Sequence, residues 1–120
     1  MMHQSFKIRQ RINGYNYYAL IELEVDENFD KELIIEYDDS RVDPKWKSSI
    51  DFGIKYFHFH YLENENKGFA VLVRNLHTMI GDSTPSIVFY ITVKCLTELF
   101  SFKKDLVKIN QETGEFIFFR

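Results

Sequence analysis

The pair Asn13-Gly14 constrains the fold of this chain more than any other feature. It lies between two runs rich in strand-forming residues, 5–12 and 15–25, and both of its residues tolerate the positive φ of a two-residue hairpin turn. From Ala19 to Val25, inward apolar residues alternate with Leu20, Glu22 and Glu24, the period of a strand with one buried face. The sequence therefore predicts that the chain begins with two antiparallel strands.

Turn and helix signals predict the next elements. A third strand is expected at 32–37, and Asp43-Pro44 predicts a helix start, because Asp can cap a helix and Pro fits its first position. Apolar residues then recur at steps of three and four at Trp46, Ile50, Gly53, Ile54, Phe57 and Tyr61. We expect Gly53 to let this helix lie close to the sheet, at a propensity cost of about 1 kcal/mol relative to Ala. The helix should end in the polar run 63–67.

The second half of the chain predicts a central strand, a buried helix and a terminal hairpin. Residues 68–76 are apolar on both parities, which favours a central strand covered at least in part on both faces. Residues 87–102 carry the stripe of a second helix, and strands at 106–110 and 115–119 flank a turn that contains Gly114. The order is βββαβαββ, which predicts a single α+β domain over 1–120. It would be a two-layer sandwich with a mainly antiparallel sheet and two helices on one face.

Composition limits the possible partners. The chain has 120 residues, 45% of them hydrophobic, enough for one core. Its net charge is -3 and its longest basic run is Lys103-Lys104, so any RNA contact must be local. The single cysteine, Cys95, is expected to be a small buried hydrophobe. The polar start and the charges that interrupt each apolar run predict a cytoplasmic protein without a membrane span.

The stretch Gly81-Asp82-Ser83-Thr84-Pro85-Ser86 has three possible interpretations: an active-site turn, a phosphate cradle or a helix start. The second glycine of a G-x-S-x-G nucleophile turn is missing, and so is the Lys-Ser or Lys-Thr pair of a P-loop. Capping by Asp82, Ser83 or Thr84, with Pro85 at the first helical position, explains the residue types. We therefore expect no catalytic residue, no nucleotide, no cofactor and no enzymatic activity.

The pair His58 and His60 is one candidate for a metal site. Residues two apart on a helix point about 200° away from each other, so the two imidazoles cannot share an ion. We expect no metal here, and two partly exposed histidines on either flank of the helix.

Four pieces of the sequence occur in an order that resembles domain IV of the ribosomal translocase, elongation factor G. They are Asn13-Gly14-Tyr15 with 18–24, Asp43-Pro44 with 50–54, Lys67-Gly68-Phe69-Ala70-Val71, and His77 followed by 81–89. The resemblance covers most of residues 13 to 100. It implies the fold of domain 2 of ribosomal protein S5, with the Asn13 turn and the His77 to Ser83 loop near one end.

In the translocase, that end enters the decoding region and contacts tRNA and messenger RNA. Here the His77 to Ser83 loop is longer than in the family, and the basic first loop is reduced to Arg9, Arg11, Asn13 and Gly14. No GTPase domain or nucleotide motif accompanies it, so this chain cannot couple hydrolysis to translocation.

Two functions remain open from the sequence. The first is binding of structured RNA or the ribosome through a tip formed by Arg9, Arg11, Asn13, Tyr15, His77 and Asp82. The second is a protein-interaction or accessory module, with a protein partner or a second copy, that keeps the fold without RNA binding. The acidic balance and the 12 Phe and 7 Tyr residues favour this alternative.

Overall fold

The computed structural model describes residues 1–118 and confirms the predicted order of elements. The predicted end of the last strand, Phe119, lies outside the described residues. A short 3₁₀ turn, η1, precedes the first helix. The elements are β1 (Met2–Ile12), β2 (Tyr15–Asn28), β3 (Leu33–Tyr37), η1 (Pro44–Trp46), α1 (Lys47–Glu65), β4 (Gly68–Thr78), α2 (Pro85–Leu99), β5 (Val107–Ile109) and β6 (Phe116–Phe118).

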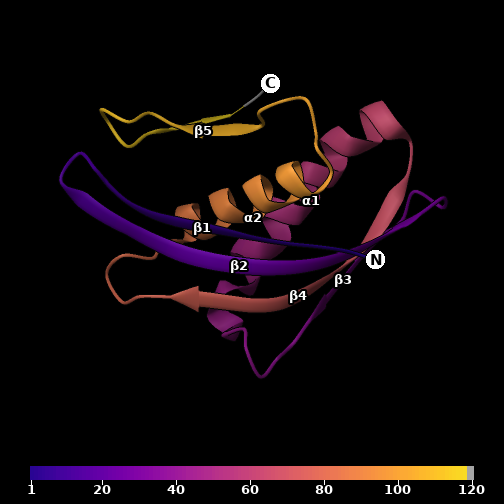
Figure 1. The fold of residues 1–120 in the computed structure, drawn as a ribbon, viewed down its shortest axis with the longest axis horizontal. Helices are drawn as coiled ribbons and strands as arrows, with labels where there is room; N and C mark the ends of the chain where they lie inside the picture. The colour runs from indigo at the N-terminus through magenta and orange to yellow at the C-terminus, as the bar shows by residue number, and fades with distance from the viewer. Residues whose placement is uncertain (119–120) are drawn as a thin grey trace.

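The four long strands form one sheet in the order β1-β2-β4-β3 (Figure 1). All neighbours pair antiparallel except β3 and β4, which are parallel. One face is buried: Ala19, Ile21 and Leu23 of β2 have no exposed surface, and both helices pack against this side. The β5–β6 hairpin is a separate two-stranded sheet beside α2. This arrangement is the predicted two-layer α+β sandwich.

The expectation about β4 is confirmed: it is a central strand, and both of its faces are at least partly covered. Its buried face carries Phe69, Val71 and Val73, but Ala70 and Leu72, which point to the other face, are only half-buried. The helices cover one face of the sheet, so the apolar residues of the opposite parity reflect the strand's position between β2 and β3. Among the described elements no helix covers the outer face, where the side chains of β2 and β4 are mostly half-buried and those of β1 are exposed.

The apolar stripe of α1 is buried as predicted, but the role of Gly53 differs from the expectation. A Cβ atom on Gly53 would lie 3.0 Å from Cβ of Thr92 and 3.2 Å from the carbonyl oxygen of Phe89, both in α2. The missing side chain thus allows the two helices to approach each other, and not the helix to approach the sheet.

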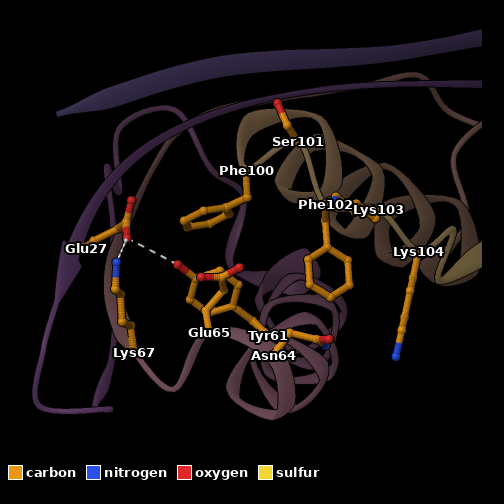
Figure 2. A pocket seen from close by; sticks show the side chains of 10 residues that line it. All are labelled: Glu27, Tyr61, Asn64, Glu65, Lys67, Phe100, Ser101, Phe102, Lys103 and Lys104. Carbon is orange, nitrogen blue, oxygen red and sulfur yellow. Dashed lines mark hydrogen bonds and ion pairs between the residues drawn. The ribbon is translucent and has the colours of Figure 1, made fainter.

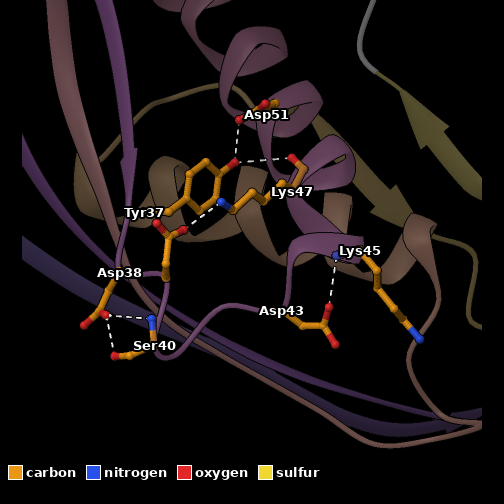
Figure 3. A network of polar contacts seen from close by, with 8 residues as sticks. Tyr37, Asp38, Ser40, Asp43, Lys45, Lys47 and Asp51 are labelled. Atoms are coloured by element: carbon orange, nitrogen blue, oxygen red, sulfur yellow. Dashed lines mark hydrogen bonds and ion pairs between the residues drawn. The ribbon is translucent and has the colours of Figure 1, made fainter.

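Asp43-Pro44 starts the helical segment as predicted. The Asp43 carboxylate accepts a hydrogen bond from the Lys45 amide at 3.0 Å, and Pro44 is the first helical residue (Figure 3). Just before it, the Asp38 carboxylate accepts bonds from the Ser40 amide and hydroxyl, which lower the pKa of Asp38. Local side-chain acceptors therefore satisfy the backbone amides of Ser40 and Lys45 in this connection.

The Tyr37 side chain connects the end of β3 to the start of α1 by hydrogen bonds. The Tyr37 hydroxyl donates to the Asp51 carboxylate and lies 3.2 Å from the carbonyl oxygen of Lys47 (Figure 3). The Lys47 ammonium lies 4.9 Å from the centre of the Tyr37 ring and pairs with Asp39 at 2.7 Å. Burial and the bond to Asp51 raise the pKa of Tyr37, so the phenol remains a donor.

Thr84 is the residue that caps α2, among the three candidates. Its hydroxyl accepts a hydrogen bond from the Ile87 amide at 3.2 Å, and Pro85 follows as the first helical residue. We expect Thr84→Ala to lower the free energy of unfolding by about 1 kcal/mol, because one helix-end amide loses its acceptor. Urea denaturation measures this loss, and Thr84→Ser, which keeps the hydroxyl, should recover most of it. Equal losses in both variants would contradict the capping role.

The helical histidines contact different neighbours. His58 lies against Phe69, and His60 lies against Tyr56 and Phe59. The expectation that both are partly exposed is wrong for His60, which is 7% exposed because the rings of Tyr56 and Phe59 pack against it. Within residues 1–118, no group of three or more metal-ligating side chains gathers.

Cys95 is fully buried as predicted, and burial raises the pKa of its thiol. Among the described helices, neither has the length and apolar character needed to cross a membrane.

Candidate nucleic-acid interface

Three connections meet at one end of the molecule: the β1–β2 turn, the β4–α2 loop and the β5–β6 turn (Figure 1). In the first, Asn13 and Gly14 have φ of 49° and 82°, the positive values predicted for a two-residue hairpin turn. We call this end of the molecule the tip.

Hydrogen bonds attach the β4–α2 loop to β2. The Tyr18 amide donates to the carbonyl oxygen of Asp82 at 2.9 Å. The Ser83 hydroxyl donates to the carbonyl oxygen of Tyr18 at 2.5 Å and accepts from the Met79 amide at 2.9 Å. Ser83 therefore links the loop to β2 by hydrogen bonds. This structural role accounts for the serine at this position, and no role as a catalytic nucleophile is needed to explain it.

The β5–β6 turn adds a third contact that the sequence analysis did not anticipate. The Asn13 side-chain amide donates to the carbonyl oxygen of Thr113 at 3.4 Å, and the side chains of Gln10 and Gln111 are hydrogen-bonded. These contacts join residues about a hundred positions apart in the chain. The β5–β6 turn thus contacts the Asn13 hairpin turn and helps to hold it in place.

A hollow of about 340 Å³ opens between the β1–β2 hairpin and the β4–α2 loop. Of the six residues predicted for the tip, Arg9, Arg11 and Asp82 line this hollow, while Asn13 and Tyr15 lie at the turn. Its lining residues are Arg9, Gln10, Arg11, Asn16, Tyr17, Tyr18, Met79 and Asp82. The Tyr15 side chain is 67% exposed, which leaves its ring free to stack on a ligand.

His77 joins the tip through Tyr18. The Tyr18 hydroxyl and Nδ1 of His77 are 2.7 Å apart, and their rings meet edge to face at 5.4 Å. The pairing places both on the outer face of the sheet, where Arg9 lies opposite Tyr18. All six predicted residues therefore occupy the same end of the molecule.

Charge is separated along the outer face of the sheet. Lys7, Arg9 and Arg11 are exposed near the tip, and none of them takes part in an ion pair between residues of the described part of the chain. The acidic residues of β2 lie toward its other end, where Glu22 contacts His3 at 2.7 Å and Glu24 contacts Arg74 at 3.7 Å. Arg9 and Arg11 are thus free to meet an anionic ligand, and Asp82 is the one carboxylate among the described residues that line their hollow.

A larger hollow, of about 550 Å³, lies at the opposite end (Figure 2). Tyr61, Phe100 and Phe102 supply aromatic surface, and Glu27 accepts from the Tyr61 hydroxyl at 3.2 Å and pairs with Lys67 at 3.6 Å. Burial and the charge of Glu27 raise the pKa of Tyr61. Acidic and basic side chains are interspersed here, so the charge of this hollow favours no class of ligand.

An apolar groove of about 280 Å³ lies between the start of α1, the start of α2 and β6. Its aromatic residues include Phe52 and Phe118, which are 63% and 44% exposed. The groove is lined by Ser49, Phe52, Pro85, Ser86, Phe89, Phe116 and Phe118.

Several tip residues escaped the sequence analysis. Asn16 and Tyr18 could have been found from the Asn13-Gly14 turn, because its register places them opposite Arg11 and Arg9. Gln111 and Thr113 could not, since no local pattern indicates that the last hairpin folds back to the first.

Comparison with solved structures supports the fold. No family model matches the chain, and no curated protein matches its sequence. A crystal structure of a protein from Thermus thermophilus is similar, with a TM-score of 0.64 and 14% identity. The match covers 84% of this chain and 16% of the other, so this chain corresponds to a small part of a much longer protein. At this identity the likeness concerns the fold alone: a two-layer α+β sandwich.

Proposed function

We propose that this chain is a non-enzymatic RNA-binding module, similar to domain IV of elongation factor G, that binds structured RNA or the ribosome through its tip. The observation that carries the proposal is the convergence of the β1–β2 hairpin and the β4–α2 loop around Arg9 and Arg11. These guanidinium groups are exposed and can make bidentate contacts with phosphate.

The other tip residues supply contacts to bases and sugars. Tyr15 offers an exposed ring for stacking, and Asn13 and Asn16 offer amides at the same edge. Asp82 can accept hydrogen bonds from base amino groups or 2′-hydroxyls, and its single charge does not cancel the two arginines. The interface is small and local, as the acidic balance of the chain requires.

The test is RNA affinity as a function of salt. Purified protein should bind ribosomes or a structured RNA, with a log-log salt slope that reports the phosphates neutralised. We expect the double variant Arg9→Ala with Arg11→Ala to reduce that slope by about two and to weaken binding at low salt. Fluorescence anisotropy with labelled RNA measures both quantities.

The matched control is Lys103→Ala with Lys104→Ala, which removes the same charge at the opposite end of the molecule. Its slope should stay close to that of the unmodified protein. If both double variants lower the slope equally, the tip has no special role. If the unmodified protein shows no salt-sensitive binding, the RNA function is refuted.

The second candidate function is a protein-interaction module, which the exposed aromatic groove favours. Exposed aromatic residues are enriched at protein interfaces, with a protein partner or with a second copy. A second copy would give a concentration-dependent mass in analytical ultracentrifugation, and Phe52→Ser should abolish that dependence. A mass that is monomeric at every concentration would exclude the homodimer.

A further inference from the structure

The strand β1 forms an open edge of the four-stranded sheet. It pairs with β2 over its whole length, Met2 with Val25 through Ile12 with Tyr15, and β2 is its sole partner among the described strands. The β5–β6 hairpin contacts it near the tip through the side chain of Gln10 and forms its own separate sheet. At 11 residues, β1 is longer than the edge strands that proteins usually leave uncovered.

The register of the hairpin shows which backbone groups face outward. In a two-residue hairpin, the residues that flank the turn, here Ile12 and Tyr15, form a hydrogen-bonded pair, and such pairs then alternate along the ladder. The even residues of β1 therefore bond to β2. The odd residues, from His3 to Arg11, direct their N–H and C=O groups toward the open edge. Among the described residues, no hydrogen bond outside the ladder engages the backbone of Lys7, Arg9 or Arg11.

The same odd residues carry the cations of the outer face. Across from Lys7, Arg9 and Arg11, β2 supplies Leu20, Tyr18 and Asn16, none of which is acidic. The acidic residue Glu22 of β2 already has a partner, because its carboxylate lies 2.7 Å from the His3 ring nitrogen. A row of exposed cations thus runs beside a row of backbone donors and acceptors that have no partner among the described residues.

This charge disfavours a second copy of the chain at the edge. Antiparallel pairing of two β1 strands around Lys7 would place Lys7 opposite its own copy, so that like charges face each other at the centre of the pair. A strand with carboxylates at alternate positions would instead complement every cation.

We propose that the β1 edge is a binding site for an extended acidic segment of a partner protein, which adds a fifth strand to the sheet. Backbone hydrogen bonds to the odd residues provide affinity, and glutamate or aspartate side chains on the outer face pair with Lys7, Arg9 and Arg11. This site goes beyond the proposed RNA function, because it depends on the backbone of the edge and on Lys7, which does not line the tip hollow.

The test uses a labelled synthetic peptide as long as β1, in which glutamate and valine alternate. We expect binding by fluorescence anisotropy, together with slower hydrogen exchange at the amides of Ser5, Lys7 and Arg9. Lys7→Pro removes an outward N–H without removing a ladder bond to β2, so the fold should persist while affinity falls about tenfold or more. Lys7→Ala removes the charge alone and should weaken binding by at most about fivefold.

The matched peptide control replaces glutamate with lysine and should not bind. Equal affinity for the two peptides, equal effects of Lys7→Pro and Lys7→Ala, or protection of amides elsewhere would each overturn the proposal. Absence of binding by the acidic peptide would do so too, as would dimerisation of the chain through β1. RNA affinity and peptide affinity are measured in separate experiments. Failure of the peptide to bind would therefore refute this proposal and leave the proposed RNA function to its own test.

Discussion

Replacing Phe57 by alanine is expected to lower the free energy of unfolding by about 3–5 kcal/mol. The Phe57 side chain has no exposed surface and lies at the centre of an aromatic cluster. Its ring centroid is 5.4 Å from that of Phe100, 5.3 Å from that of Phe102 and 6.0 Å from that of Phe69. These residues come from α1, β4 and the segment after α2, so truncation leaves a cavity where the two layers and the chain after α2 meet.

Chemical denaturation of Phe57→Ala gives the change directly, provided that unfolding remains two-state. Phe59→Ala is the matched control, because Phe59 lies on the same helix and is 62% exposed. We expect this control to change stability by less than about 1 kcal/mol. Similar losses in the two variants would mean that Phe57 does not hold the core together. A small domain has about 5–15 kcal/mol in total, so Phe57→Ala should be close to the limit of folding.

Gly68→Ala is expected to cost about 3 kcal/mol or more, the largest effect of an added methyl group among the five glycines of the chain. A Cβ atom there would lie 2.0 Å from the carbonyl oxygen and 2.4 Å from the amide nitrogen of Glu32. Both contacts are with backbone, which cannot move aside as a flexible side chain can. The start of β4 and the approach to β3 must separate, which breaks the bond from the Phe69 amide to Glu32 at 3.0 Å.

Gly14→Ala provides the comparison. Gly14 has φ of 82° and no atom within 4 Å of an added Cβ, so its substitution costs only the left-handed conformation, about 1 kcal/mol. The melting temperature of Gly68→Ala should therefore be well below that of Gly14→Ala. The reverse order would show that the β3–β4 contact is more adaptable than its backbone geometry indicates.

These variants also separate folding from binding. Phe57 and Gly68 lie away from the tip, so their substitution should reduce RNA binding only through unfolding. Arg9 and Arg11 are exposed, so their substitution should leave the free energy of unfolding nearly unchanged. A measurement of stability beside each affinity distinguishes the two effects.

The sequence by itself determined the elements and their order. The Asn13-Gly14 turn, the alternation in β2, Asp43-Pro44 and Thr84-Pro85 act within a few residues, where backbone dihedrals, capping and periodicity are local properties. For that reason the hairpin, both helix starts and the two-layer α+β class were predictable. The register of the same turn was enough to place Arg9 and Arg11 opposite Tyr18 and Asn16, although that step was not taken from the sequence.

Only the tertiary structure decided what each element faces. Gly53 meets α2 and not the sheet, His60 is buried and not partly exposed, and Leu72 of the central strand β4 is half-buried on the face that carries no helix. The contact of Thr113 with Asn13 and the open edge of β1 depend in the same way on how distant segments pack. A local pattern shows which face of an element is apolar, but the partner of that face is chosen by close packing among segments far apart in the chain.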